Sequence, residues 1–170
     1  PGAVLRFVRP RRVGLCYITA GQQERNSGGA EAAGSEGIEV PMQVMIVEDE
    51  PNIVESLSFV FRREGWQVAA ALDGTKAIER LLKDTPDVRI LDVMIPPFNG
   101  CEVLERVRSE AARKSLPFLV LTAKGQEQDR HTALRLGADA FVTKPFSNRD
   151  IVQRVRELAE ASSALPSGSL

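Results

Sequence analysis

Short, continuous apolar runs recur along the chain, separated by polar or amphipathic segments. Residues 44–47 are apolar without interruption and are followed directly by the acidic residues Glu48 and Asp49. A run of this length is typical of a strand that is buried on both faces of a sheet. We predict five such strands, at residues 44–47, 66–71, 88–92, 118–122 and 140–143.

Apolar residues between these runs recur with the spacing of an amphipathic helix. The first such segment starts near Pro51, which suits a first helical turn, and ends before Gly65. The segment before Gly137 is mostly polar, with few apolar positions. We predict five helices, around residues 53–61, 77–82, 100–108, 126–136 and 148–161.

Five strands that alternate with five helices predict a doubly wound α/β fold. Right-handed crossovers make the sheet parallel and place helices on both of its faces. Ligands of such sheets bind beyond the carboxyl ends of the strands. Functional residues are therefore sought where each predicted strand ends.

Composition divides the chain into three parts. Residues 21–37 are rich in Gly, Ser, Ala, Glu and Gln, which favours a flexible linker. We expect residues 1–41 to be a disordered or non-native leader, either translated from upstream of a start at Met42 or acting as a functional arm. Residues 42–161 form the predicted domain, and residues 162–170 a flexible tail.

Charge and cysteine content narrow the functional classes. The chain has 22 basic and 23 acidic residues, so its net charge predicts no binding to nucleic acid or membranes. No apolar stretch approaches the roughly 18 residues of a membrane-spanning helix. Cys16 and Cys101 are far apart and fit neither a disulfide framework nor a metal site. These features predict a cytoplasmic protein.

Chemically active residues follow four of the predicted strands. Glu48 and Asp49 follow the first strand, Asp92 ends the third, and Thr122 and Lys144 come at the ends of the fourth and fifth. Clustered carboxylates repel one another and need a compensating cation, and Mg²⁺ prefers such oxygen ligands. An aspartate between a metal ion and an ammonium group suits phosphoryl transfer to its carboxylate.

Each of these residues also has an ordinary structural interpretation. The acidic pair could favour the dipole of the next helix, and Asp92 could cap a helix. Thr122 could be a turn hydroxyl and Lys144 a solvated lysine. Their joint placement at one sheet edge favours a functional site over these four separate explanations.

Five motifs in order resemble the receiver domain of two-component response regulators, of the single-domain chemotaxis type. The resemblance covers residues 43–161 and implies the flavodoxin-like strand order 2-1-3-4-5. The motifs are VEDE at 47–50, LDVMIP at 91–96, LTA at 121–123, GAD at 137–139 and TKPF at 143–146.

This resemblance implies a role for each residue at the strand ends. Asp92 would accept the phosphoryl group. Magnesium would be bound by the side chains of Asp49 and Asp92, by the backbone carbonyl of Met94 and, through water, by Glu48. Lys144 would pair with Asp92 and then with the phosphate.

The resemblance also implies a switch. Thr122 would move toward the phosphate, and Phe141 would rotate into the space that Thr122 leaves. The Lys144–Pro145 peptide bond is expected to be cis. Three features depart from the family pattern. Glu48 replaces the usual aspartate, and the loop at residues 95–100 carries two prolines in place of one. Arg89 occupies a strand position that is usually apolar, where a guanidinium needs a partner.

The implied partners are a sensor histidine kinase or a histidine phosphotransfer protein and a downstream protein target. The output face would comprise residues 126–136, 140–143 and 148–161, and phosphorylation could pair it with a second copy of the chain. This face carries Arg130, Arg135, Asp139, Arg154 and Arg156.

The domain would then be no enzyme beyond its own phosphorylation and dephosphorylation. One alternative is a phosphatase like the haloacid dehalogenases, but these need a second aspartate where Met94 stands. The other is a receiver-like binding module that is never phosphorylated. Such modules usually lose the acidic pair, the acceptor aspartate or the lysine, all of which this chain keeps.

Overall fold

A parallel five-stranded sheet forms the centre of the molecule. The computed structural model describes residues 40–111, 115–123 and 127–164. The strand order β2-β1-β3-β4-β5 confirms the predicted fold class. The strands are β1 (Gln43–Val47), β2 (Gln67–Ala71), β3 (Val88–Asp92), β4 (Phe118–Ala123) and β5 (Ala140–Lys144).

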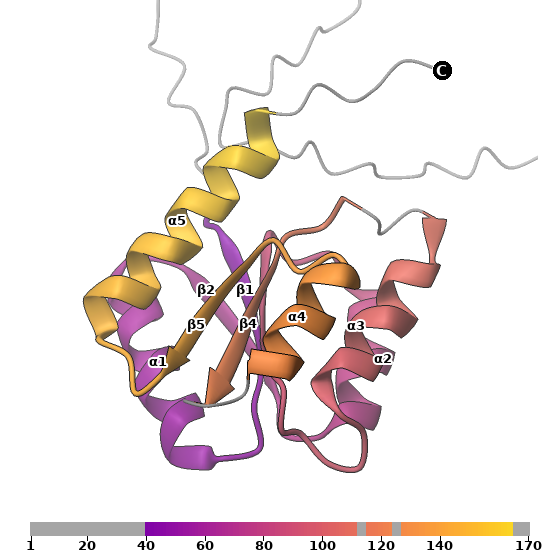
Figure 1. Cartoon of the computed structure of the whole chain (residues 1–170). Coiled ribbons are helices and arrows are strands. Elements are labelled where there is room, and N and C mark those ends of the chain that lie inside the picture. The colour runs from indigo at the N-terminus through magenta and orange to yellow at the C-terminus, as the bar shows by residue number, and fades with distance from the viewer. Residues whose placement is uncertain (1–39, 112–114, 124–126, 165–170) are drawn as a thin grey trace, which may run out of the picture. The chain divides into compact units, whose positions relative to one another are not determined.

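Helices cover both faces of this sheet. Figure 1 shows helices on both sides of it. One face carries α1 (Pro51–Arg63) and α5 (Asn148–Ala164). The other face carries α2 (Gly74–Lys83), α3 (Gly100–Ser109) and α4 (Glu127–Arg135).

Side chains of β1 alternate between two apolar cores, as expected for a strand buried on both faces. Val44 and Ile46 pack under α1 and α5. Met45 and Val47 pack in the second core, with residues of α2, α3 and α4. The continuous apolar pattern therefore reflects burial on both sides.

Local hydrogen bonds set several helix ends. The side chain of Asp73 accepts a bond from the Lys76 amide at 2.7 Å and caps α2. At the end of α1, Gly65 adopts a φ of 80°. Trp66 still donates its amide to Phe61 there, which explains why β2 begins one residue later than predicted.

The two ends of the chain lie mostly outside the described residues. The predicted leader is described only from residue 40 onward, and its proposed role stays a prediction. Helix α5 continues to Ala164, three residues past its expected end, and the rest of the predicted tail is not described. Over the parts of the chain that the structure describes, no helix is long and apolar enough to cross a membrane.

Arg89 lies buried in the first half of β3. Its side chain has 0% exposure, and its guanidinium carbon is 5.5 Å from the centroid of the Phe118 ring. Arg108 of α3 also lies over this ring, at 5.0 Å. The expected need for a partner is therefore met in part by an aromatic ring of the neighbouring strand.

Candidate functional site

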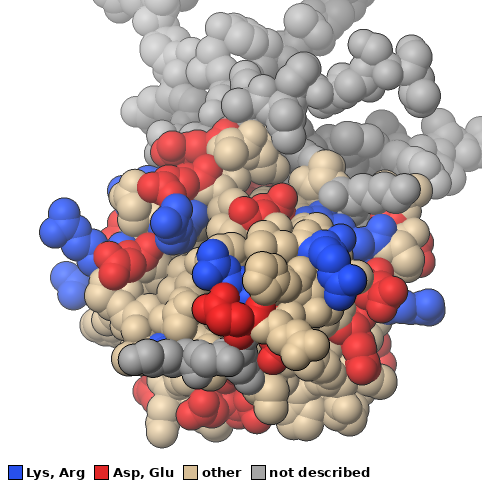
Figure 2. Space-filling model, in the orientation of Figure 1, with Lys and Arg blue, Asp and Glu red and all other residues tan. Residues whose placement is uncertain are grey.

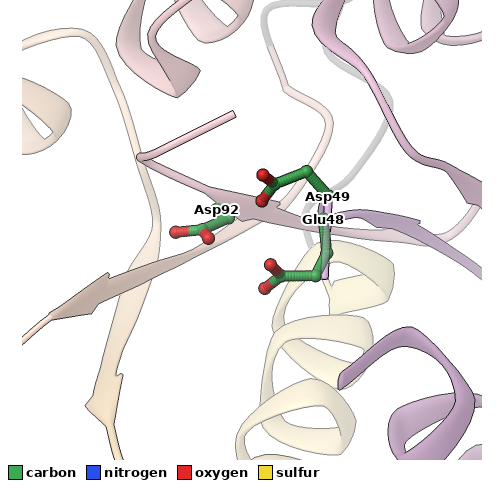
Figure 3. Close-up of side chains that lie close together, drawn as sticks. All are labelled: Glu48, Asp49 and Asp92. Carbon is green, nitrogen blue, oxygen red and sulfur yellow. The ribbon is translucent and has the colours of Figure 1, made fainter. Parts of the chain in front are cut away.

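Three carboxylates meet where β1 and β3 end. Glu48 and Asp49 follow β1 directly, and Asp92 is the last residue of β3. Each offers an oxygen within 4.8 Å of the other two. Figure 3 shows the three side chains close together at these two strand ends. Glu48 and Asp92 are buried, with 0% and 4% exposure, whereas Asp49 reaches solvent.

Lys144, at the end of β5, is the cation that faces these carboxylates. Its Nζ donates hydrogen bonds to Glu48 Oε2 and Asp92 Oδ2, both at 2.8 Å. It also lies 3.9 Å from Glu50 Oε1. Burial disfavours the ammonium charge, but the bonds to Asp92 and Glu48 outweigh this and raise the pKa of Lys144. Lys144 therefore stays charged at neutral pH.

Glu48 is the carboxylate of this cluster whose pKa is most affected by its surroundings. Burial is the largest influence on Glu48, and the charge of Asp92 adds to it. Together they outweigh the bond to Lys144 and raise the pKa of Glu48 to about 7. Near neutral pH, Glu48 is thus balanced between its acid and its carboxylate.

The donor set fits a hard divalent cation. Oxygens from Glu48, Asp49 and Asp92 lie close enough to share one ion, and the exposed Asp49 leaves room for retained water. The raised pKa of Glu48 means that added positive charge here would be favourable. The predicted magnesium ligands are brought together, while the role of the Met94 carbonyl stays a prediction.

Backbone groups of the loop after β3 and of Gly100 lie close to Asp92 and hold it in one orientation. The amide of Met94 donates to Asp92 Oδ1 at 3.2 Å, so the two carboxylate oxygens have different partners. Gly100, at the start of α3, donates its amide to the Val93 carbonyl at 2.7 Å. A Cβ at Gly100 would collide with the Asp92 carbonyl oxygen. Sequence reasoning gave Gly100 no role, although a glycine directly after the loop was a visible signal.

Thr122 and Phe141 lie on one face of the adjacent strands β4 and β5. Phe141 pairs in register with Val120, which is two residues before Thr122. Thr122 is buried, with 2% exposure, and Phe141 is half-buried against the core of its face. The structure places the two side chains on the same face of adjacent strands. Their role as a switch stays a prediction.

Two peptide bonds near the site are cis. The Lys144–Pro145 bond is cis, as predicted, and so is the Pro96–Pro97 bond, which the sequence reasoning did not anticipate.

Known proteins that resemble this chain are signalling proteins. Residues 44–156 match the family described as "Response regulator receiver domain". The "Probable transcriptional regulatory protein TcrX" of Mycobacterium tuberculosis (strain ATCC 25618 / H37Rv) is 45% identical over 118 residues, which cover 69% of this chain and 50% of that protein. The transcriptional regulatory protein TrcR of the same strain is 42% identical over 125 residues, covering 74% of this chain and 48% of that protein.

A response regulator of known structure has a fold similar to that of this chain. The chemotaxis response regulator CheY4 of Vibrio cholerae superposes with a TM-score of 0.66 at 27% identity, covering 70% of this chain and 99% of that one. The chain thus spans about half the length of the curated relatives it matches and nearly all of this solved one.

Proposed function

Because the chain belongs to the response regulator receiver domain family, we propose that it accepts a phosphoryl group on Asp92. The donor would be a phosphohistidine of a sensor histidine kinase or of a histidine phosphotransfer protein, or a small phosphodonor. The observation that supports this proposal best is the setting of the Asp92 carboxylate. One oxygen bonds to Lys144 and the other to the Met94 amide, at the sheet edge where ligands of this fold bind.

The proposed transfer replaces one bond to phosphorus by another. A lone pair on an Asp92 carboxylate oxygen forms a P–O bond while the P–N bond of the donor phosphohistidine breaks. The electron pair of that bond returns to the imidazole nitrogen of the donor. Hydrolysis reverses the modification, since water attacks phosphorus and releases inorganic phosphate with the free carboxylate.

Lys144 would stabilise the charge that moves to Asp92. Its ammonium already contacts Asp92 and can shift to an oxygen of the phosphoryl group. Mg²⁺ would be held by Asp49, Asp92, the Met94 carbonyl and, through water, Glu48, and would neutralise charge on the transferring oxygens. The buried Glu48 holds Lys144 in position from the other side at 2.8 Å.

The output of the phosphorylated state would be a change in protein contacts. Thr122 would donate its hydroxyl to the phosphoryl group, and Phe141 would follow, which alters the face of α4, β5 and α5. A downstream protein, or a second copy of the chain, would read that face. The names of TcrX and TrcR support control of transcription as the eventual output.

Phosphoryl labelling tests the central step. The protein is incubated with acetyl phosphate and Mg²⁺ and its intact mass is measured. We expect a gain of one phosphoryl group in the wild type and none in Asp92→Asn. Asp150→Asn is the matched control, because Asp150 is an exposed carboxylate of α5. An unlabelled wild type, or equal labelling of the Asp92 variant, would refute the proposal.

A further inference from the structure

The guanidinium of Arg130, in α4, lies directly over the ring of Phe141. Its central carbon is 3.8 Å from the ring centroid. The other arginine–aromatic contacts among the described residues are between 5.0 and 6.0 Å. A separation of 3.8 Å places the two planar groups in direct contact, where cation–π attraction is strongest.

Competing partners of Arg130 are weak. Arg130 forms an ion pair with Glu127 at 3.6 Å, and the Glu127 side chain is 71% exposed. An exposed pair of this kind contributes little to stability. The side chain of Arg130 is only 39% exposed, so most of it is covered. Phe141 is therefore the contact that best accounts for the position of this guanidinium.

Charges on the surrounding face do not explain the contact either. Figure 2 shows basic and acidic side chains interspersed over the visible face, which carries α5 and α4 in the orientation of Figure 1. No broad field of one sign draws the guanidinium toward the ring. The stacking is a local interaction between one cation and one aromatic side chain.

Phe141 is well placed to sense changes at Thr122. Both side chains lie on the same face of neighbouring strands, and Thr122 is buried at the edge that holds Asp92. Any rotation or inward shift of the ring must separate it from Arg130. The contact therefore stabilises the arrangement in which the ring stays under α4.

We infer that Arg130 is a positioning residue for the phosphorylation site, acting through Phe141. It holds the ring in the unphosphorylated arrangement and so opposes the change that phosphorylation favours. This inference rests on the proposed function, since it concerns the equilibrium of that same switch.

The test removes the guanidinium and keeps an unbranched apolar side chain in its place. Beryllofluoride with Mg²⁺ serves as the probe, because it mimics a phosphoryl group on aspartate. We expect Arg130→Met to bind beryllofluoride about twofold to tenfold more tightly than the wild type, as expected for loss of a partly exposed cation–π contact. Arg130→Lys, which keeps the charge, should fall between the two. The matched control is Arg135→Met, an exposed arginine of the same helix.

A second readout reports the ring itself. The protein is labelled with 4-fluorophenylalanine, and the ¹⁹F signal of Phe141 is identified by its loss in Phe141→Leu. Without beryllofluoride, Arg130→Met should move this signal part of the way toward its beryllofluoride-bound position. In the Phe141→Leu background, the same substitution should leave beryllofluoride affinity unchanged.

The possible failures can be told apart. A wild type that binds no beryllofluoride would refute the proposed phosphorylation and the inference with it. A second result is that the wild type binds beryllofluoride while Arg130→Met binds it equally or more weakly and leaves the ¹⁹F signal of Phe141 unmoved. That result would overturn only the role of Arg130. An equal effect in the Phe141→Leu background would also overturn it, because the arginine would then act by another route.

Discussion

Charged side chains lie buried at both edges of the sheet, but their balance differs. At the carboxyl edge, Glu48, Asp49 and Asp92 lie together, and among the described residues Lys144 is the cation that contacts Glu48 and Asp92. At the amino edge, two arginines surround the Phe118 ring together with one carboxylate. We call this second group the amino-edge cluster; it comprises Arg89, Arg108, Phe118 and Asp139.

Contacts within the chain stabilise the amino-edge cluster. Arg108 Nη2 donates to Asp139 Oδ2 at 2.8 Å and to the Gly137 carbonyl at 2.6 Å. The same Asp139 oxygen accepts the Phe118 amide at 2.8 Å. These bonds tie α3 and β4 to the loop before β5. Within the cluster, these bonds hold Arg108 and Asp139 in place.

At the carboxyl edge, the contacts of the described residues do not offset the burial of Glu48. Lys144 donates one hydrogen bond to Glu48 and one to Asp92, yet the pKa of Glu48 is still raised to about 7. Burial of Glu48, with the charge of Asp92 beside it, costs stability, and an added cation would offset that cost. Charge at the amino edge thus supports the fold, while charge at the carboxyl edge fits the binding and chemistry that we propose.

Removal of Lys144 should produce the largest effect at the carboxyl edge. We expect Lys144→Met to slow labelling by acetyl phosphate by about 100-fold, in the range found when one electrostatic contact to a transition state is lost. Intact-mass time courses would measure this. Lys76→Met is the control, because the Lys76 side chain is 71% exposed. A labelling rate near that of the wild type would show that the ammonium is dispensable.

A substitution in the amino-edge cluster should lower the stability of the protein and leave its labelling by acetyl phosphate unchanged. We expect Asp139→Ala to lower the free energy of unfolding by about 2 kcal/mol, because Arg108 and the Phe118 amide lose an acceptor. Urea denaturation measures the loss. The labelling rate of the folded protein should not change, and Asp150→Ala should leave stability nearly unaltered. Slower labelling in folded Asp139→Ala would mean that the two edges are coupled.

Stability without metal should depend on pH through Glu48. Its pKa is about 7 in the folded chain and 4.5 in the reference state, so between these values the folded state binds more protons than the unfolded state. The free energy of unfolding should therefore fall as pH rises from 4.5 to 7, by about 2 kcal/mol. Denaturation at several pH values would measure this.

Glu48→Gln is the variant that isolates this effect. It cannot ionise, so most of the fall should disappear, whereas Glu55→Gln, on α1, should keep the wild-type slope. Stability that rises over this pH interval in the wild type would contradict the assignment.

Added Mg²⁺ should raise stability by less than the other changes alter it. The rise should depend on carboxylates at the carboxyl edge and not on the amino-edge cluster. At ten times its dissociation constant, a bound ion adds about 1.4 kcal/mol to stability. We expect a rise in melting temperature with Mg²⁺ for the wild type and for Asp139→Ala, but none for Asp49→Asn. Thermal unfolding with and without Mg²⁺ would test this, and equal stabilisation of Asp49→Asn would place the ion elsewhere.

Local patterns were enough to predict the elements and the edge that holds the site. Apolar runs and helical spacing depend on nearby residues, so each strand and helix was recognised to within a few residues at its ends. Parallel strands all end at one edge, and this alone brought Asp92 and Lys144 together. The strand order came from the family resemblance, because periodicity does not distinguish one order from another.

Only the tertiary structure decided how particular side chains meet. Lys144 and Glu48 are 96 positions apart, and their 2.8 Å contact depends on the register of the strands between them. The raised pKa of Glu48, the approach of Gly100 to Asp92 and the stacking of Arg130 on Phe141 likewise arise between separate elements. Sequence patterns determined which residues reach the edge. Packing determined which of them touch, because distances of a few ångströms depend on the whole fold.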